Sequence, residues 1–111
     1  MQRGRAYSKE CLSRVYQSDK INWTIGTDAY HGLLYKELEI AVECGAPGLK
    51  TLKGVTVNAA KMCGIEKEKG QLKAGMKADI IAVDENPLEN ICTLKDVSFV
   101  MKRGTVYTFF A

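Results

Sequence analysis

Ile21-Asn22-Trp23-Thr24-Ile25-Gly26-Thr27-Asp28-Ala29 is the part of this chain that says most about its architecture. Residues 21–25 form a short run rich in β-branched and aromatic side chains, which predicts a strand. Asp28 follows on a loop that leads into a helix. Barrels of alternating strands and helices carry their chemistry at this position, so Asp28 is a candidate catalytic residue. An acid here is equally suited to capping the following helix, where its carboxylate accepts hydrogen bonds from backbone amides.

The length and charge of the chain limit what it can do. At 111 residues it falls well short of a closed (β/α)8 barrel, which takes about 250 residues. The net charge of +3 is weak, and Lys50, Lys53 and Lys61 share one predicted helix, as a solvated face does. We therefore expect no nucleic-acid partner. Because no apolar run approaches the roughly 20 residues of a membrane span, we also expect no membrane association.

The cysteines are widely separated in the sequence. None of them forms a close pair at metal-ligand spacing: they are Cys11, Cys44, Cys63 and Cys92. We expect reduced thiols in the core of a cytoplasmic protein.

Three helices are predicted in the first two thirds of the chain. Ser8 is a suitable N-cap for the first, because apolar residues follow at helical spacing: Leu12, Val15 and Tyr16. The second helix runs from Leu33 to Cys44 and ends at Gly45. The third begins at Pro47, continues to Met62 and stops at Gly64.

The chain from Lys69 onward is rich in β-structure. An apolar run flanked by Asp79 and Asp84 predicts a strand whose two acids are solvated at its ends. Val97–Lys102 and Thr105–Phe110 predict a hairpin that turns at Arg103-Gly104, because glycine adopts positive φ at little cost.

Several segments, in a fixed order, resemble the C-terminal third of the metal-dependent amidohydrolases. They are Gly26-Thr27-Asp28-Ala29, His31-Gly32, Glu37-Leu38-Glu39, Thr56-Val57-Asn58-Ala59-Ala60, Gly64, the run from Gly70 to Ile81, Asn86 to Ile91, and Val97 to Tyr107. The resemblance covers about residues 20–108 and is nearest to the imidazolonepropionase-like and Xaa-Pro dipeptidase-like (prolidase-type) branch. One such motif is weak, whereas the ordered set is specific.

The resemblance implies an α/β fold followed by β-structure. Residues 1–68 would supply the last strand and helices of an amidohydrolase (β/α)8 barrel, with residues 21–25 as its eighth strand. Residues 69–111 would supply strands of the composite β-sandwich and end in a hairpin. The barrel is then incomplete within this chain.

The resemblance also implies a site. Asp28 matches the aspartate that binds the catalytic divalent metal, zinc above all, and shuttles a proton. In such enzymes a metal-bound hydroxide attacks an amide-like carbon, and the aspartate delivers a proton to the leaving nitrogen. His31, the single histidine, is a candidate substrate-binding residue, although a loop histidine equally suits a surface hydrogen-bonding role. Asn58 is better explained by helix packing or by a hydrogen bond to the backbone.

The departures from the family concern the metal ligands. The His-x-His pair, the metal-bridging lysine and the later histidines of the family have no counterpart in this sequence. A catalytic zinc needs about three protein ligands. We therefore expect the C-terminal part of a metal-dependent hydrolase of carbon–nitrogen bonds in non-peptide or dipeptide amides, inactive as an isolated chain.

Two kinds of partner follow from this expectation. The N-terminal part of the barrel would complete the enzyme, or further copies of the chain would cover its strand edges and apolar helix faces. The alternative function is a non-catalytic oligomerising or binding module derived from the amidohydrolase fold.

Overall fold

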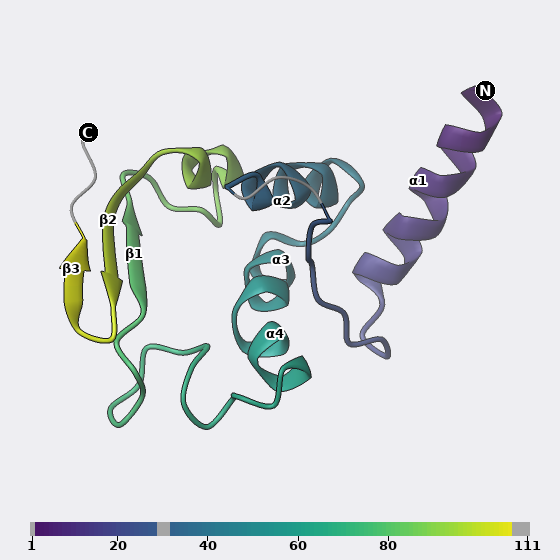
Figure 1. Cartoon of the computed structure of the whole chain (residues 1–111). Helices are drawn as coiled ribbons and strands as arrows, with labels where there is room; N and C mark the ends of the chain where they lie inside the picture. Colours follow the sequence, from purple (N-terminus) through teal and green to yellow (C-terminus); the bar gives the residue numbers. More distant parts are fainter. Residues whose placement is uncertain (1, 29–31, 108–111) are drawn as a thin grey trace.

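The computed structural model describes residues 2–28 and 32–107, with helices first and strands last (Figure 1). The order of elements is α1 (Gln2–Gln17), α2 (Leu34–Glu43), α3 (Gly48–Val55), α4 (Val57–Met62), β1 (Ile80–Val83), the 3-10 helix η1 (Ile91–Lys95), β2 (Val97–Lys102) and β3 (Thr105–Tyr107). In the described residues no helix is both long enough and apolar enough to cross a membrane.

The predicted second helix is confirmed to within one residue at each end as α2. Gly45 ends it at φ 95°, with the Gly45 amide donating to the Val42 carbonyl and the Ala46 amide to the Ala41 carbonyl. These two bonds make a Schellman motif, which a glycine at positive φ favours. The small core lies mainly here, since most of its buried residues come from α2 and the chain just after it, with one from α4: Leu38, Ala41, Cys44, Ala46, Thr51 and Ala60.

The predicted third helix is two helices in the structure, α3 and α4, divided at Thr56 (φ −120°, ψ −95°). Thr56 lies within the β-branched run Val55-Thr56-Val57, whose side chains crowd a helix. Its Oγ1 also donates to the Leu52 carbonyl at 2.7 Å, a bond that bends helices. Gly70 approaches the break so closely that a Cβ there would lie 3.1 Å from the Thr56 carbonyl oxygen.

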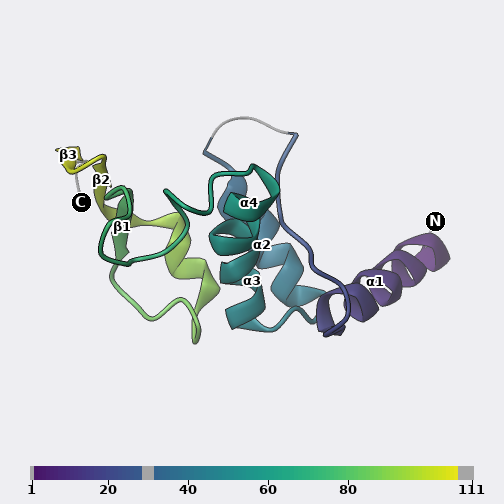
Figure 2. The same ribbon diagram turned by 90° about the horizontal axis from the view of Figure 1, so that it is seen from below.

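Helix α1 begins at Gln2, six residues before Ser8, so the assignment of Ser8 as its N-cap is wrong. Ser8 lies inside the helix, where its Oγ donates to the Gly4 carbonyl at 2.9 Å. No proline separates Gln2 from Ser8, so the helix continues through this segment. Figure 2 shows α1 extending away from the other helices, at the opposite end of the molecule from the strands.

The end of α1 is tied to α3 by one lysine. Lys50 Nζ donates to the carbonyls of Gln17 and Ser18, at 3.4 and 3.3 Å, and also pairs with Asp19. A cation is favourable at the carboxyl end of a helix, where carbonyls lack helical partners. The Lys50 ammonium, which donates to the Asp19 carboxylate, lowers the pKa of Asp19.

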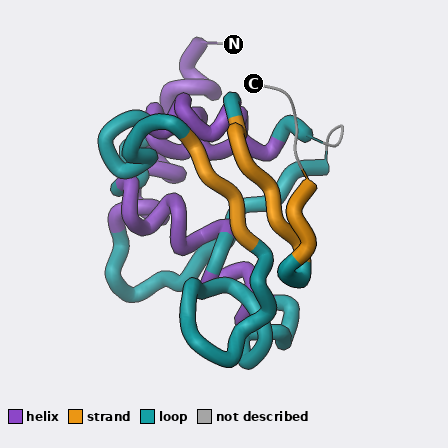
Figure 3. The backbone as a smooth tube through the Cα atoms, turned by 90° about the vertical axis from the view of Figure 1, so that its left-hand side faces the viewer, coloured by secondary structure: helices purple, strands orange, loops and turns teal. Residues whose placement is uncertain are grey.

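The three strands form an antiparallel sheet in the order β1-β2-β3 (Figure 3). Ile80 pairs with Met101, and Met101 pairs with Val106, so these residues share one face of the sheet. The register shifts between Ala82 and Val83, which marks a bulge. The predicted strand between Asp79 and Asp84 and the first arm of the predicted hairpin are confirmed; the second arm is confirmed to Tyr107, and its last residues lie outside the described ones.

The hairpin turn is also confirmed at Arg103-Gly104, where φ is 50° and 80°. Two consecutive positive φ values are those of a type I′ turn, which matches the twist of antiparallel strands.

Residues 21–25 form no strand in the structure, which corrects the expectation from their composition. A strand exists only when a neighbour shares its ladder of hydrogen bonds. Within the described ranges, the groups that bond to this segment come instead from helices α3 and α4.

Candidate functional site

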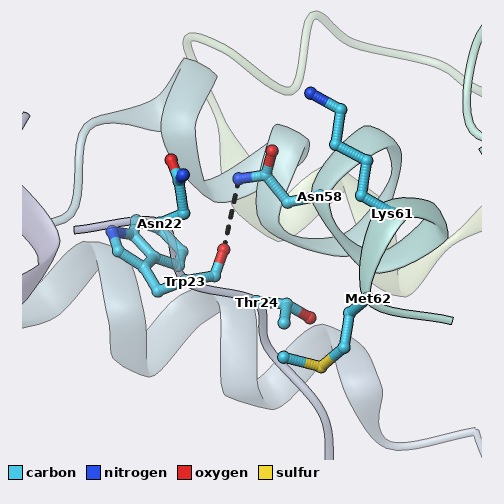
Figure 4. Close-up of a pocket in the computed structure, with 6 residues that line it drawn as sticks. All are labelled: Asn22, Trp23, Thr24, Asn58, Lys61 and Met62. Atoms are coloured by element: carbon cyan, nitrogen blue, oxygen red, sulfur yellow. Dashed lines mark hydrogen bonds between the residues drawn. The ribbon is translucent and has the colours of Figure 1, made fainter. Parts of the chain in front are cut away.

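Two hydrogen bonds hold the segment that leads to Asp28. The backbone amide of Ile25 donates to the Gly54 carbonyl of α3 at 3.2 Å. The side-chain amide of Asn58, on α4, donates to the Trp23 carbonyl at 3.2 Å (Figure 4). The expectation of a backbone hydrogen bond for Asn58 is therefore confirmed. Asp28 lies three residues beyond Ile25, so these bonds fix the chain just before the candidate carboxylate.

The Trp23 side chain reinforces this attachment. Its indole lies against Gly54, where a Cβ would come within 2.8 Å of the ring, and only glycine leaves room for it. The indole also meets the Tyr16 ring edge to face, with ring centres 4.8 Å apart. Burial is the main reason that the pKa of the Tyr16 phenol is raised. The end of α1 and the last turn of α3 thus both contact Trp23.

An open hollow of about 290 Å³ lies beside this attachment (Figure 4). Its lining combines amides, a hydroxyl, a cation and two large apolar side chains: Asn22, Trp23, Thr24, Asn58, Lys61 and Met62. Of these residues, only Asn58 has a contact predicted from the sequence, namely helix packing or a hydrogen bond to the backbone. Residues 22–24 lie beside α4 although Trp23 and Asn58 are 35 positions apart in the sequence, and no local sequence pattern predicts this contact.

Asp28 itself is exposed and lies on a bend. His31, the predicted substrate-binding residue, lies outside the described residues. In the part of the chain that the structure describes, no three His, Cys, Asp or Glu side chains gather as metal ligands. Since a zinc site needs about three protein ligands, the described donor set does not make a complete one.

Asp79 differs from the prediction that it is merely a solvated strand end. Its carboxylate pairs with Lys69 at 2.7 Å and accepts a hydrogen bond from the Arg103 amide at 2.9 Å. The Lys69 ammonium, and then the Arg103 amide, lower the pKa of Asp79. This carboxylate therefore fastens the hairpin turn to the loop before β1, a structural role.

The cysteines also differ from the prediction. Only Cys44 is a core thiol, whereas Cys11, Cys63 and Cys92 are exposed. Desolvation, followed by the neighbouring Glu39 carboxylate, raises the pKa of the Cys92 thiol.

The sequence of the chain matches the model of the amidohydrolase family over residues 10–110. It is 39% identical over 89 residues to an ochratoxinase of Aspergillus niger, a match that covers 75% of this chain and 18% of the relative. An adenine deaminase of Paracoccus denitrificans is 33% identical over 60 residues, which is 54% of this chain and 10% of that enzyme.

The fold is similar to that of larger solved structures. A Xaa-Pro dipeptidase with bound methionine superposes with a TM-score of 0.84 at 35% identity, over 91% of this chain and 25% of that structure. The A. niger ochratoxinase structure gives a TM-score of 0.77 at 34% identity, over 94% of this chain and 26% of that structure. The chain thus spans about a fifth to a quarter of the length of these two proteins.

Proposed function

The chain belongs to the amidohydrolase family, and on that premise we propose that it forms the C-terminal part of a metal-dependent hydrolase of carbon–nitrogen bonds. Residues 21–25, which form no strand in this chain by themselves, then take the place of the eighth strand of the (β/α)8 barrel, where a neighbouring strand supplies the missing ladder of hydrogen bonds. The segment from residue 69 contributes to the β-sandwich. The similarity to dipeptidase and prolidase structures favours a dipeptide-type amide as the substrate.

The attachment of the segment before Asp28 carries the proposal. Trp23 and Ile25 are held by α4 and α3 through two hydrogen bonds, and this anchoring supports a fixed course for the chain that leads to Asp28, the position where barrel enzymes carry catalytic residues. Asp28 supplies one oxygen ligand to a divalent metal, with zinc as the expected ion. The sequence has a single histidine, so the remaining ligands come from residues outside it, in the same polypeptide or in another.

The metal content of the purified chain tests this role. We expect a divalent metal to be retained only where a partner or further copies complete the site, and to be lost on Asp28→Ala. Asp84→Ala is the matched control, because it removes another exposed carboxylate that lies at a strand end. Equal metal loss in both variants, or metal retained after Asp28→Ala, would contradict the assignment of Asp28.

A second candidate function is a non-catalytic oligomerising or binding module. Large apolar side chains that are more than half exposed favour it, among them Met62 at 74%, Leu72 at 81% and Ile81 at 55%. Sedimentation of the chain distinguishes the two functions. A defined homo-oligomer that holds no metal favours the module, whereas a monomer that acquires metal only with a complementary barrel part favours the enzyme.

The scattered cysteines support a reducing compartment, and we place the protein in the cytoplasm. To test this placement, the protein is unfolded and treated with an alkylating reagent immediately on isolation. Alkylation of all four thiols is the result expected for a reducing compartment.

A further inference from the structure

We propose that Asn58 is a positioning residue for Asp28: its side-chain amide holds the Trp23 carbonyl and thereby fixes the course of the chain up to the carboxylate. The inference rests on the proposed function for the importance of Asp28, but it concerns a contact within this chain. It assigns to the α4 helix a part in setting the site, in addition to packing.

The first support is the geometry of the contact. The donor Nδ2 of Asn58 lies 3.2 Å from the Trp23 carbonyl oxygen, and this bond joins residues 35 positions apart. Figure 4 shows the side-chain amide of Asn58 directed at this carbonyl, and both residues line the hollow. The bond is partly buried, so water competes for the carbonyl less than it would at an exposed site.

The second support is what else holds the segment. Apart from the Asn58 bond, its backbone is held by the bond from the Ile25 amide to Gly54, on the neighbouring helix α3. The two bonds are two residues apart along the segment, so together they fix both its position and its direction. Without the Asn58 bond, the segment can rotate about the bond from Ile25 to Gly54, and such a rotation displaces Asp28, which lies three residues beyond Ile25.

The third support is the chemistry that position 58 requires. The group must donate to a carbonyl, so a carboxylate of the same size cannot replace the amide. Met62 and Lys61 are neighbours in the lining of the hollow, but neither one bonds to the segment in the described structure. Asn58 is therefore the side chain of α4 that anchors it.

Amide hydrogen exchange of the whole chain, without metal, tests the proposal with the isosteric variant Asn58→Asp. At neutral pH we expect the Ile25 amide to exchange at least about threefold faster, the size expected for one lost hydrogen bond. The amides of β2 should exchange as in the parent. The emission of Trp23, the single tryptophan, should shift to longer wavelength as its surroundings loosen.

A change of pH separates a hydrogen bond from packing. Below its pKa the carboxyl of Asn58→Asp regains a donor, so protection of Ile25 should return toward that of the parent at the same pH. Asn58→Ala should show no such return. Asn22→Asp is the matched control, since Asn22 lines the same hollow from the segment itself rather than from α4, and it should leave Ile25 unaffected. If Asn58→Asp does not fold, Asn58→Ser, whose hydroxyl is too short to reach, takes its place.

Three results would overturn the proposal. They are exchange of Ile25 less than about threefold faster than in the parent in Asn58→Asp, equal acceleration in β2, and equal behaviour of Asn58→Asp and Asn58→Ala at low pH. Because no metal enters this experiment, loss of metal binding by Asp28→Ala is an independent result, and either proposal can fail while the other holds.

Discussion

Gly54 and Trp23 fit against each other so closely that a Cβ at position 54 would lie 2.8 Å from Cζ3 of the indole. Gly54 lies inside helix α3, where glycine lowers helix stability by roughly 1 kcal/mol relative to alanine. The ring of Trp23 takes the space that a side chain would occupy. Helix α3 therefore carries a destabilising glycine at the point where the Trp23 ring of the segment leading to Asp28 packs against it.

Gly54→Ala should destabilise the chain in spite of its better helix propensity. Overpacking costs about 1–3 kcal/mol, and the gain in propensity offsets only part of it. Urea unfolding followed by Trp23 fluorescence measures the difference. Gly4→Ala is the control, because Gly4 is also helical and a Cβ there would project into open space, so it should not destabilise. A gain in stability with Gly54→Ala would contradict the close fit.

Gly104→Ala should weaken the hairpin through backbone strain alone. Gly104 adopts φ 80° and has open space around it, so an alanine there meets no clash but enters a left-handed conformation at about 1–2 kcal/mol. Arg103→Asn should act in the opposite direction, since asparagine tolerates the φ of 50° at position 103 better than arginine does. Thermal unfolding measures both. If neither variant moves the midpoint, the hairpin does not contribute to the cooperative unit.

The free energy of unfolding should decrease as the pH is lowered through the acid range, partly because of Asp79. The Lys69 ion pair and the Arg103 amide lower its pKa in the folded state, so its contribution is present above the unfolded pKa of about 3.9. That contribution is lost as the pH falls through the folded pKa. Glu68, which accepts a hydrogen bond from Lys77, acts in the same sense because its pKa is also lowered.

Asp79→Ala should therefore reduce the dependence of the unfolding midpoint on pH in the acid range, where the pH falls through the lowered pKa of Asp79. Asp79→Asn should have a smaller effect on the midpoint at neutral pH, because its side-chain oxygen still accepts from the Arg103 amide. Equal unfolding midpoints for the two variants would show that the hydrogen bond from the Arg103 amide to the side chain at position 79 does not contribute to stability.

The thiols should differ in their rates of labelling in the folded chain. Cys44 is buried and should react only on unfolding, whereas Cys11, Cys63 and Cys92 are exposed. Cys92 should react more slowly in the folded chain than in the unfolded chain, because its raised pKa leaves less thiolate, the reactive form. Glu39→Gln should accelerate Cys92, since the Glu39 carboxylate contributes to the raised pKa. Glu10→Gln is the control, and mass spectrometry of timed samples identifies the labelled residues.

Local patterns in the sequence account for much of the secondary structure. The apolar spacing of residues 34–43 and the glycine that follows are enough to place α2, because a helix with a C-terminal glycine depends on neighbours no more than five residues away. The Arg103-Gly104 turn has the same local character. The break at Thr56 is absent from the predicted helix, although the β-branched run Val55-Thr56-Val57 is a signal that could have revealed it.

The candidate site is only partly predictable. Asp28 and Asn58 can be identified from their place in ordered motifs, but no spacing rule connects Asn58 to Trp23 or Gly54 to Ile25. These contacts join residues 35 and 29 positions apart, and their formation depends on how α3 and α4 pack against the segment.

Short-range sterics and hydrogen bonding act within a few residues, so the amino-acid order alone settles most of the helices, the glycines that end a helix or turn a hairpin, and the family that the ordered motifs resemble. Contacts across the fold establish the rest: residues 21–25 are held by helices, α1 projects from the other elements, and Asp79 ties down the hairpin turn. The sequence does not indicate which donor will bond to a backbone carbonyl such as that of Trp23, because every residue carries the same carbonyl group. Only the packing of the chain brings Asn58 to it.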